Sequence, residues 1–232
     1  MPRAAAFFDV DQTVIRGNSA SLYARYLRRH AGARLRDLLL TAYYYGLYKV
    51  NRLDLEVVMA RSVRSLEGRA EAEYRAFCER FVAEAVVPLV YPEVAPLVAR
   101  HRAAGHVVAL ISASINFVVD PLARHLGIEH ACSTEIETVA GRLTGTYRRP
   151  ACFAAGKVHY AEAFCAARGL DLGESVFYTD SATDLPLHER VGHPRPVTPD
   201  FLLRREAARR GWPQARFGLA GAPALAAFTV IP

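Results

Sequence analysis

Lysine is nearly absent from this 232-residue chain, which contains only Lys49 and Lys157. Arginine therefore carries most of the positive charge, and the formal net charge is +6. The arginines are scattered along the chain, without a basic stripe that includes aromatic residues. Nucleic-acid-binding domains usually concentrate their basic residues on one face or along one helix. The charge is thus compatible with anionic ligands and argues against a nucleic-acid partner.

Cysteine is scarce as well. The chain has no CxxC pair and no Cys/His cluster at the spacing of metal ligands, and its four cysteines are Cys78, Cys132, Cys152 and Cys165. We therefore expect unpaired core thiols in a reducing compartment. The N-terminus lacks the pattern of a signal peptide, and no apolar run reaches the length of a membrane span. These absences predict a cytoplasmic protein without stable membrane insertion.

Three apolar runs end abruptly at small or acidic residues: AAAFFDVDQT (4–13), HVVALISAS (106–114) and SVFYTDSATD (175–184). Short apolar runs without alternation are typical of strands that are buried on both faces, as in parallel sheets. Helical patterns at 92–105 and 156–169 lie between them. This alternation predicts an α/β fold with a doubly wound, mostly parallel sheet.

The segment 18–87 breaks the alternation, because four helical patterns follow one another without a strand. The third and fourth patterns have apolar faces at helical spacing, made by Leu55, Val58, Met59, Ser62, Val63 and Leu66 and by Tyr74, Phe77, Cys78, Phe81, Val82 and Ala85. We interpret 18–87 as a small helical domain inserted into a core domain that consists of 1–17 and 88–232.

The aromatic stretch DLLLTAYYYGLY (37–48) lies within this inserted segment. It is too short to span a bilayer. Core packing, contact with a lipid-like or aromatic substrate and peripheral membrane contact all remain open interpretations. The tail after 212 contains no recognisable site.

Polar residues follow each of the three predicted strands, namely Asp9 and Asp11, Ser112 and Ser114, and Asp180 and Asp184. In an open parallel sheet, ligands bind beyond the carboxyl ends of the strands. Two unit charges ~4 Å apart repel by ~4 kcal/mol at an effective dielectric constant of about 20, so four gathered carboxylates require a cation. Mg²⁺, which prefers oxygen ligands, is the predicted ion.

Each of these motifs also has a purely structural interpretation. Asp9 and Asp11 could form an Asx-type turn or cap a helix, and the two serines or the last pair of aspartates could also cap helices. Lys157 could be a solvated residue in the first turn of a helix. In a chain with so little lysine, however, its presence there favours a requirement for a compact ammonium group.

Taken together, the motifs resemble those of the haloacid dehalogenase superfamily, which carries DxDx[TV] after its first strand. Here the same place holds Asp9-Val10-Asp11-Gln12-Thr13, followed in order by a strand that ends in Ser112, by Lys157 at the start of a helix, and by Asp180-Ser181-Ala182-Thr183-Asp184. The inserted helices resemble the small cap of the phosphoserine-phosphatase-like branch, subfamily IB. The resemblance spans residues 4–212 and implies a Rossmann-like core with a cap domain.

The resemblance implies a Mg²⁺-dependent phosphatase that hydrolyses a small-molecule phosphate monoester through an aspartyl-phosphate. Asp9 would be the nucleophile, and Asp11 the general acid and then the base. The implied metal ligands are Asp9, the carbonyl of Asp11, and Asp180, with Asp184 in support. The residues expected to bind the phosphate group or to orient its loop are Ser112, Ala113, Lys157 and Thr13.

Substrate choice is where the chain departs from this branch. Phosphoserine-specific members resemble one another in placing an acidic residue nine positions after the nucleophile, where this chain has Asn18. An amide offers no charge to a substrate ammonium group, so we predict that phosphoserine is a poor substrate and that a neutral or more apolar ester is preferred.

Three alternatives stay open: a phosphotransferase that uses an acceptor other than water, a phosphoserine phosphatase, and a non-catalytic scaffold that binds phosphorylated ligands or membranes. The sequence identifies neither the leaving group nor the oligomeric state.

Overall fold

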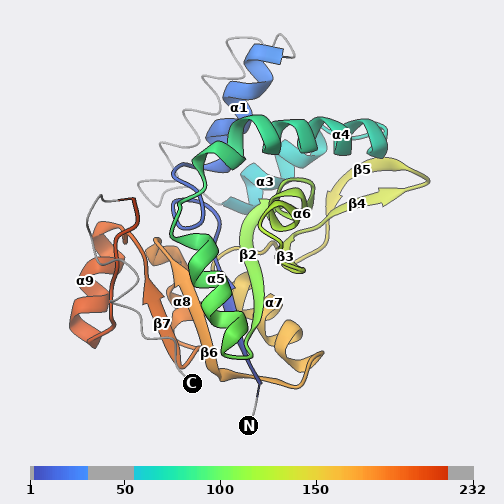
Figure 1. The fold of residues 1–232 in the computed structure, drawn as a ribbon. Helices are drawn as coiled ribbons and strands as arrows, with labels where there is room; N and C mark the ends of the chain where they lie inside the picture. The colour runs from blue at the N-terminus through green and yellow to red at the C-terminus, as the bar shows by residue number, and fades with distance from the viewer. Residues whose placement is uncertain (1–2, 31–54, 219–232) are drawn as a thin grey trace.

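A five-stranded sheet forms the centre of the molecule (Figure 1). The computed structural model describes residues 3–30 and 55–218. The strand order is β3-β2-β1-β6-β7, and every neighbouring pair is parallel. The strands are β1 (Arg3–Phe8), β2 (Val107–Ile115), β3 (His130–Thr134), β6 (Leu170–Thr179) and β7 (His193–Pro196). The predicted α/β class is confirmed.

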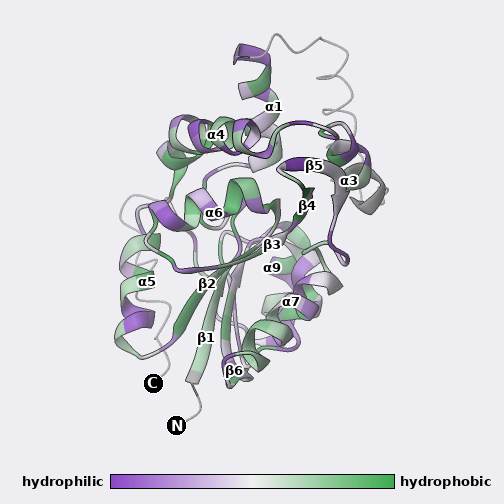
Figure 2. Cartoon of the chain, turned by 90° about the vertical axis from the view of Figure 1, so that its right-hand side faces the viewer, coloured by the Kyte–Doolittle hydropathy of each residue, from purple (hydrophilic) through white to green (hydrophobic). Residues whose placement is uncertain are grey.

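Helices cover both faces of the sheet (Figure 2). Ala6 and Phe8 of β1 belong to the apolar cluster that includes α5 (Val94–Ala103) and α6 (Asn116–His125). Ala5 and Phe7 belong to the cluster on the other face, with α7 (Ala155–Ala166) and α8 (Leu185–His188). Successive side chains of a strand point to opposite faces, and both faces here are covered. The run AAAFF is therefore apolar throughout instead of alternating.

The inserted segment is helical in the part that the structure describes. Its helices are α1 (Ser19–His30), α3 (Leu55–Arg64) and α4 (Glu71–Phe81). The fourth predicted pattern is not one continuous α-helix, because α4 continues as the π-helix η1 (Val82–Val86) and the 3₁₀ turn η2 (Val87–Leu89). The second pattern and the aromatic stretch 37–48 lie outside the described residues. The domain boundaries at 17/18 and 87/88 stay predictions.

A β-hairpin, which the sequence analysis missed, packs against the inserted helices. It consists of β4 (Ile136–Val139) and β5 (Arg142–Tyr147), antiparallel to one another. The turn between α3 and α4 is hydrogen-bonded to it, since Gly68 N donates to Leu143 O at 2.9 Å and Leu143 N donates to Arg69 O at 3.0 Å. The helices and the hairpin share one apolar cluster: Val63, Leu66, Tyr74, Cys78, Phe117, Ile136, Leu143, Tyr147 and Ala151.

The strands β3 and β7, at the two edges of the sheet, were also missed. The sequence of β7 is HPRP, and proline cannot donate a hydrogen bond to a neighbouring strand. Such a sequence is tolerated at a sheet edge, where one side of the strand needs no partner, but it has no strand-like pattern. The sequence of β3, HACST, is similarly short and polar.

Two expectations from composition can be compared with the structure. All four cysteines are buried free thiols, as predicted. None of the described helices combines the length and the apolar character needed to cross a membrane. In the tail after 212, Ala215 pairs with Val197 and Phe217 packs against Tyr91.

His101, on α5, is a fully buried histidine that the core keeps neutral. Its Nε2 lies 2.7 Å from the Tyr178 hydroxyl, and its Nδ1 lies 2.8 Å from Nδ1 of His106. Burial, followed by the nearby His106, Arg100 and Arg195, lowers the pKa of His101 to about 3. Protonating His101 would therefore place a buried charge between α5 and β6, which the fold disfavours.

The pH dependence of folding follows from this shift. Between about pH 6.5 and pH 3, the unfolded chain binds a proton at His101 and the folded chain does not. Each unit by which the pH falls within this range therefore lowers the free energy of unfolding by about 1.4 kcal/mol. Between pH 7 and pH 5, we expect the free energy of unfolding, measured with urea, to fall by about 2 kcal/mol less in His101→Gln than in the unchanged protein. His125→Gln, at an exposed position, is the control. Equal pH slopes for all three proteins would contradict this.

Candidate active site

The strand register brings the three predicted polar clusters to one edge of the sheet. Phe8 of β1 pairs with Leu110 of β2 on one side and with Tyr178 of β6 on the other. The next residue, Asp9, donates its N–H to Tyr178 O at 2.9 Å. The sheet also reverses its strand order at β1, with β2 and β3 to one side and β6 and β7 to the other. Such a reversal opens the crevice where ligands bind in this architecture.

Lys157 joins two of these clusters. Its Nζ donates to Asp9 Oδ1 and to Asp184 Oδ2, each at 2.7 Å, and all three side chains are buried. Burial lowers the pKa of Lys157, but contact with Asp184 and Asp9 outweighs it, so the pKa is raised and the ammonium stays charged. The interpretation of Lys157 as a solvated residue is wrong. Thr179 also donates to Asp184 Oδ2, at 2.7 Å.

The site holds more negative charge than Lys157 neutralises. Burial raises the pKa of the Asp9 carboxyl to about 7, Lys157 opposes the rise, and Asp184 and Asp11 add to it. Burial, together with Asp9 and Asp184, also raises the pKa of Asp180 well above its usual value. The Asp180 carboxylate has no hydrogen bond or ion pair within the described part of the chain. This unbalanced charge fits a divalent cation.

The donor set also fits Mg²⁺. In the described ranges, no three His, Cys, Asp or Glu side chains gather with the geometry of metal ligands. The predicted set needs only two side chains, Asp9 and Asp180, besides the main-chain carbonyl of Asp11. Mg²⁺ is commonly held by one or two carboxylates and keeps several water ligands, so this small oxygen set suits it.

Asp11 is held by the first residues of the inserted segment. Its Oδ1 accepts from Ser19 N at 2.8 Å, and its Oδ2 accepts from Ser19 Oγ at 3.0 Å and from Asn18 Nδ2 at 3.1 Å. Burial raises the pKa of Asp11, and the bonds from Ser19 oppose the rise. Ser19 Oγ also lies 2.5 Å from Ser114 Oγ, so it connects the first and second polar clusters.

Ser19 is a site residue that the sequence analysis missed. Its only sequence signal is its place at the start of α1, directly after a residue suited to cap a helix. That residue is Asn18, whose Oδ1 accepts from Ser21 N at 3.0 Å. Both polar groups of the Asn18 side chain therefore bind the protein itself, one in the helix cap and one on Asp11.

The second cluster does not cap a helix. Helix α6 begins after Ile115 without a side-chain cap, so neither Ser112 nor Ser114 has the capping role that the sequence left open. Ser112 is buried, and its Oγ accepts from Ser114 N at 3.2 Å. The Ala113 carbonyl accepts from Thr134 Oγ1 at 3.1 Å.

The remaining predicted residues have clear positions. Thr13 is fully buried, and its hydroxyl has no hydrogen-bond partner among the residues described. In the last motif, Ser181 caps the short helical turn that follows, accepting from Thr183 N, and Asp180 does not. The capping interpretation is therefore wrong for Asp180.

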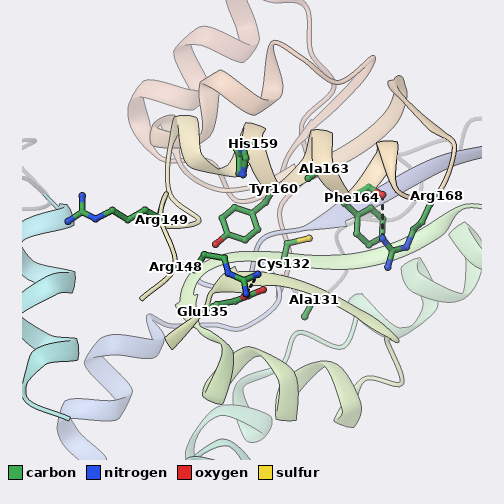
Figure 3. Close-up of a pocket in the computed structure, with 10 residues that line it drawn as sticks. All are labelled: Ala131, Cys132, Glu135, Arg148, Arg149, His159, Tyr160, Ala163, Phe164 and Arg168. Atoms are coloured by element: carbon green, nitrogen blue, oxygen red, sulfur yellow. Dashed lines mark hydrogen bonds and ion pairs between the residues drawn. The ribbon is translucent and has the colours of Figure 1, made fainter. Parts of the chain in front are cut away.

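Two cavities flank α7. One, of about 320 Å³, lies on the side of α7 toward β3 and contains none of the predicted site residues; Figure 3 shows its lining, which includes Arg148, Tyr160 and Arg168. The other, of about 300 Å³, lies between α3 and the start of α7. No polar or charged residue is among those that line it, the last of which directly precedes Lys157: Met59, Pro150, Ala151, Phe153, Ala154, Ala155 and Gly156.

Fold and site together define a doubly wound α/β protein whose acidic centre is built around Asp9 and Lys157. Comparison with known families gives the particular family: residues 6–189 match the model of the haloacid dehalogenase-like hydrolases. The chain belongs to that family, and it is an enzyme of the phosphomonoester-hydrolysing kind found there. The resemblance seen in its motifs is confirmed.

Similar proteins cover nearly the whole chain. A histidinol-phosphatase of Neisseria meningitidis is 32% identical over 220 residues, 91% of this chain and 98% of the relative. A phosphoserine phosphatase of Mycobacterium tuberculosis is 33% identical over 221 residues, 94% and 72% of the two chains.

Solved structures show the same architecture. A Bordetella pertussis protein of unknown function has a TM-score of 0.85 at 32% identity, covering 92% of this chain and 98% of its own. A phosphoserine phosphatase solved as a phospho-aspartyl intermediate analogue has a TM-score of 0.65 at 16% identity, covering 90% and 99%, which is a likeness of fold.

The buried ion pairs predict a large stability effect at Lys157. Lys157→Met leaves Asp9 and Asp184 buried without a counter-charge, so we expect the free energy of unfolding at pH 8 without added metal to fall by roughly 3–5 kcal/mol. Arg190→Met, which removes an exposed ion pair with Glu162, is the control and should change little. A similar loss in both variants would contradict the role of Lys157.

Proposed function

We propose that the protein is a Mg²⁺-dependent phosphatase of a small-molecule phosphate monoester and that it works through an aspartyl-phosphate on Asp9. The observation that carries this proposal is that two neighbouring carboxylates have different hydrogen-bond partners. Asp9 is bound by the Lys157 ammonium, while Asp11 is turned to neutral donors at the start of α1. Different surroundings suit the two groups to nucleophilic and acid–base roles.

The first step is attack of an Asp9 carboxylate oxygen on phosphorus. The bond from phosphorus to the ester oxygen breaks, and the leaving alkoxide takes a proton from Asp11. Water then attacks the aspartyl-phosphate and gives its proton to the Asp11 carboxylate, which releases inorganic phosphate and restores Asp9. The raised pKa of Asp11 favours the protonated form that the first step needs. The pKa of Asp9 is also raised, to about 7, and a metal ion bound beside it would favour the ionised form that attacks phosphorus.

The other residues would position the phosphate group or neutralise its charge. Asp9, Asp180 and the Asp11 carbonyl would hold Mg²⁺, which supplies positive charge for the phosphoryl oxygens. Ser112 and the backbone around Ala113 would donate hydrogen bonds to those oxygens, and Lys157 would offset their charge. Asp184 keeps Lys157 in place, and buried Thr13 orients the first loop.

A second enzymatic function remains as an alternative. A phosphotransferase would pass the phosphoryl group from Asp9 to an alcohol, and product analysis with added glycerol separates it from a phosphatase. A non-catalytic scaffold is disfavoured, because the acidic centre is complete and connected by hydrogen bonds.

The substrate we favour is a neutral or apolar ester. Asn18 offers no charge, and its polar groups are bound to Asp11 and Ser21, so it is poorly suited to meet an ammonium group. Without a charged partner, selectivity for an amino-acid substrate falls by roughly five- to thirtyfold. The apolar cavity between α3 and the start of α7 could receive an uncharged leaving group.

Histidinol phosphate is a second candidate. The observation in its favour is the similarity, over nearly its whole length, to the histidinol-phosphatase of Neisseria meningitidis. Histidinol phosphate carries an ammonium group, as phosphoserine does, so the argument from Asn18 applies to both. Its aromatic imidazole, however, suits an apolar cavity better than the carboxylate of phosphoserine does.

The nucleophile is tested by Asp9→Asn. The amide cannot attack phosphorus, and Lys157 keeps its ion pair with Asp184, so the fold should persist while turnover of p-nitrophenyl phosphate falls by at least about four orders of magnitude. Asp171→Asn, an exposed position at the opposite end of β6, is the control. Substantial activity in Asp9→Asn would assign the nucleophile to another group.

The substrate is tested by comparing kcat/KM for phosphoserine, histidinol phosphate and a series of uncharged alkyl and aryl phosphates. We expect an uncharged ester to exceed phosphoserine by about tenfold or more. A clear lead for histidinol phosphate would select the second candidate and, because this substrate also carries an ammonium group, would contradict the argument from Asn18. A lead for phosphoserine would show that a residue other than Asn18 meets its ammonium group.

A further inference from the structure

We propose that Asp200 is a positioning residue for the metal site, because it fixes the loop that presents Asp180. This inference rests on the proposed function, in which Asp180 is a Mg²⁺ ligand. Asp200 lies 20 residues further along the chain, at the start of α9 (Phe201–Arg210), and has no recognisable motif around it.

Pairing of β6 with β7 brings Asp200 to this loop. Thr179 at the end of β6 is opposite Pro196 of β7, and Val197 N donates to Thr179 O at 2.9 Å. The segments that follow β6 and β7 therefore leave the sheet side by side, one at Asp180 and the other toward Asp200. Asp200 N donates to Asp180 O at 2.7 Å, which ties the two loops at their main chains.

The Asp200 carboxylate serves both loops at once. Its Oδ1 accepts from Leu203 N at 2.7 Å and caps α9, and its Oδ2 accepts from Ala182 N at 2.9 Å. With the main-chain bond, Asp200 contacts the loop on both sides of Ser181. The Asp180 side chain has no donor of its own among the described residues, so its direction depends on the main chain that Asp200 holds.

The two carboxylate oxygens of Asp200 have different partners, which allows two roles to be tested separately. We call the bond from Leu203 N to Oδ1 the cap and the bond from Ala182 N to Oδ2 the clamp. Asparagine caps helices about as well as aspartate, so Asp200→Asn keeps the bond to Leu203 N. Its amide nitrogen then faces the Ala182 N–H, donor against donor, and the clamp is lost. Asp200→Glu keeps the charge but moves the carboxylate outward by one methylene, which separates the clamp from a purely electrostatic effect.

The experiment measures Mg²⁺ binding by isothermal titration calorimetry without substrate, and the melting temperature without metal. We expect the Kd for Mg²⁺ to rise about tenfold in Asp200→Asn and severalfold in Asp200→Glu, with melting temperatures within about 4 °C of the unchanged protein. Asp171→Asn is the matched control, because it removes the same charge from a carboxylate that accepts a local N–H from Gly173. Its Kd should not change.

The outcomes are distinguishable. If the unchanged protein binds Mg²⁺ and Asp200→Asn binds it like Asp171→Asn, the positioning role is overturned and the proposed function stands. If Asp200→Glu binds Mg²⁺ as tightly as the unchanged protein, the effect of Asp200 comes from its charge alone, and the clamp is also overturned. If the unchanged protein binds no Mg²⁺, the metal assignment and this inference fail together. Asp200→Ser, which also keeps a cap, replaces Asp200→Asn if that variant does not fold.

Discussion

The buried contact of Lys157 with Asp9 and Asp184 constrains the rest of the structure. Two carboxylates are held out of water only because an ammonium lies 2.7 Å from each. Helix α7 must therefore begin close to the end of β1, and the chain before it folds tightly to allow this. A Cβ at Gly156 would lie 1.9 Å from the Ala151 carbonyl oxygen, so this position requires glycine.

A second consequence is that the ammonium alone does not balance the site. A dianionic phosphate would approach Asp9 and Asp180 while Lys157 is already shared between two carboxylates. Repulsion between unit charges at contact distance amounts to a few kcal/mol even in a partly polar medium. The divalent cation that we propose would resolve this conflict and would explain why an acidic centre suits an anionic substrate.

The inserted helices are connected to the acidic centre at one end and to the hairpin at the other. At the first end, Ser19 binds Asp11 and approaches Ser114. At the second, the turn between α3 and α4 is hydrogen-bonded to β5 through Leu143. The inserted segment therefore contacts both Asp11 and the hairpin.

The sequence by itself determined the sheet class, the order of the motifs and the acidic residues at the strand ends, because burial on both faces of a parallel sheet leaves a direct apolar signal in runs such as AAAFF. It could not determine β3, β7 or the hairpin, whose short polar or proline-containing strands depend on neighbours distant in the chain. The contacts of Ser19 with Asp11 and of Asp200 with Ala182 were decided by tertiary structure alone, since no local sequence pattern encodes them.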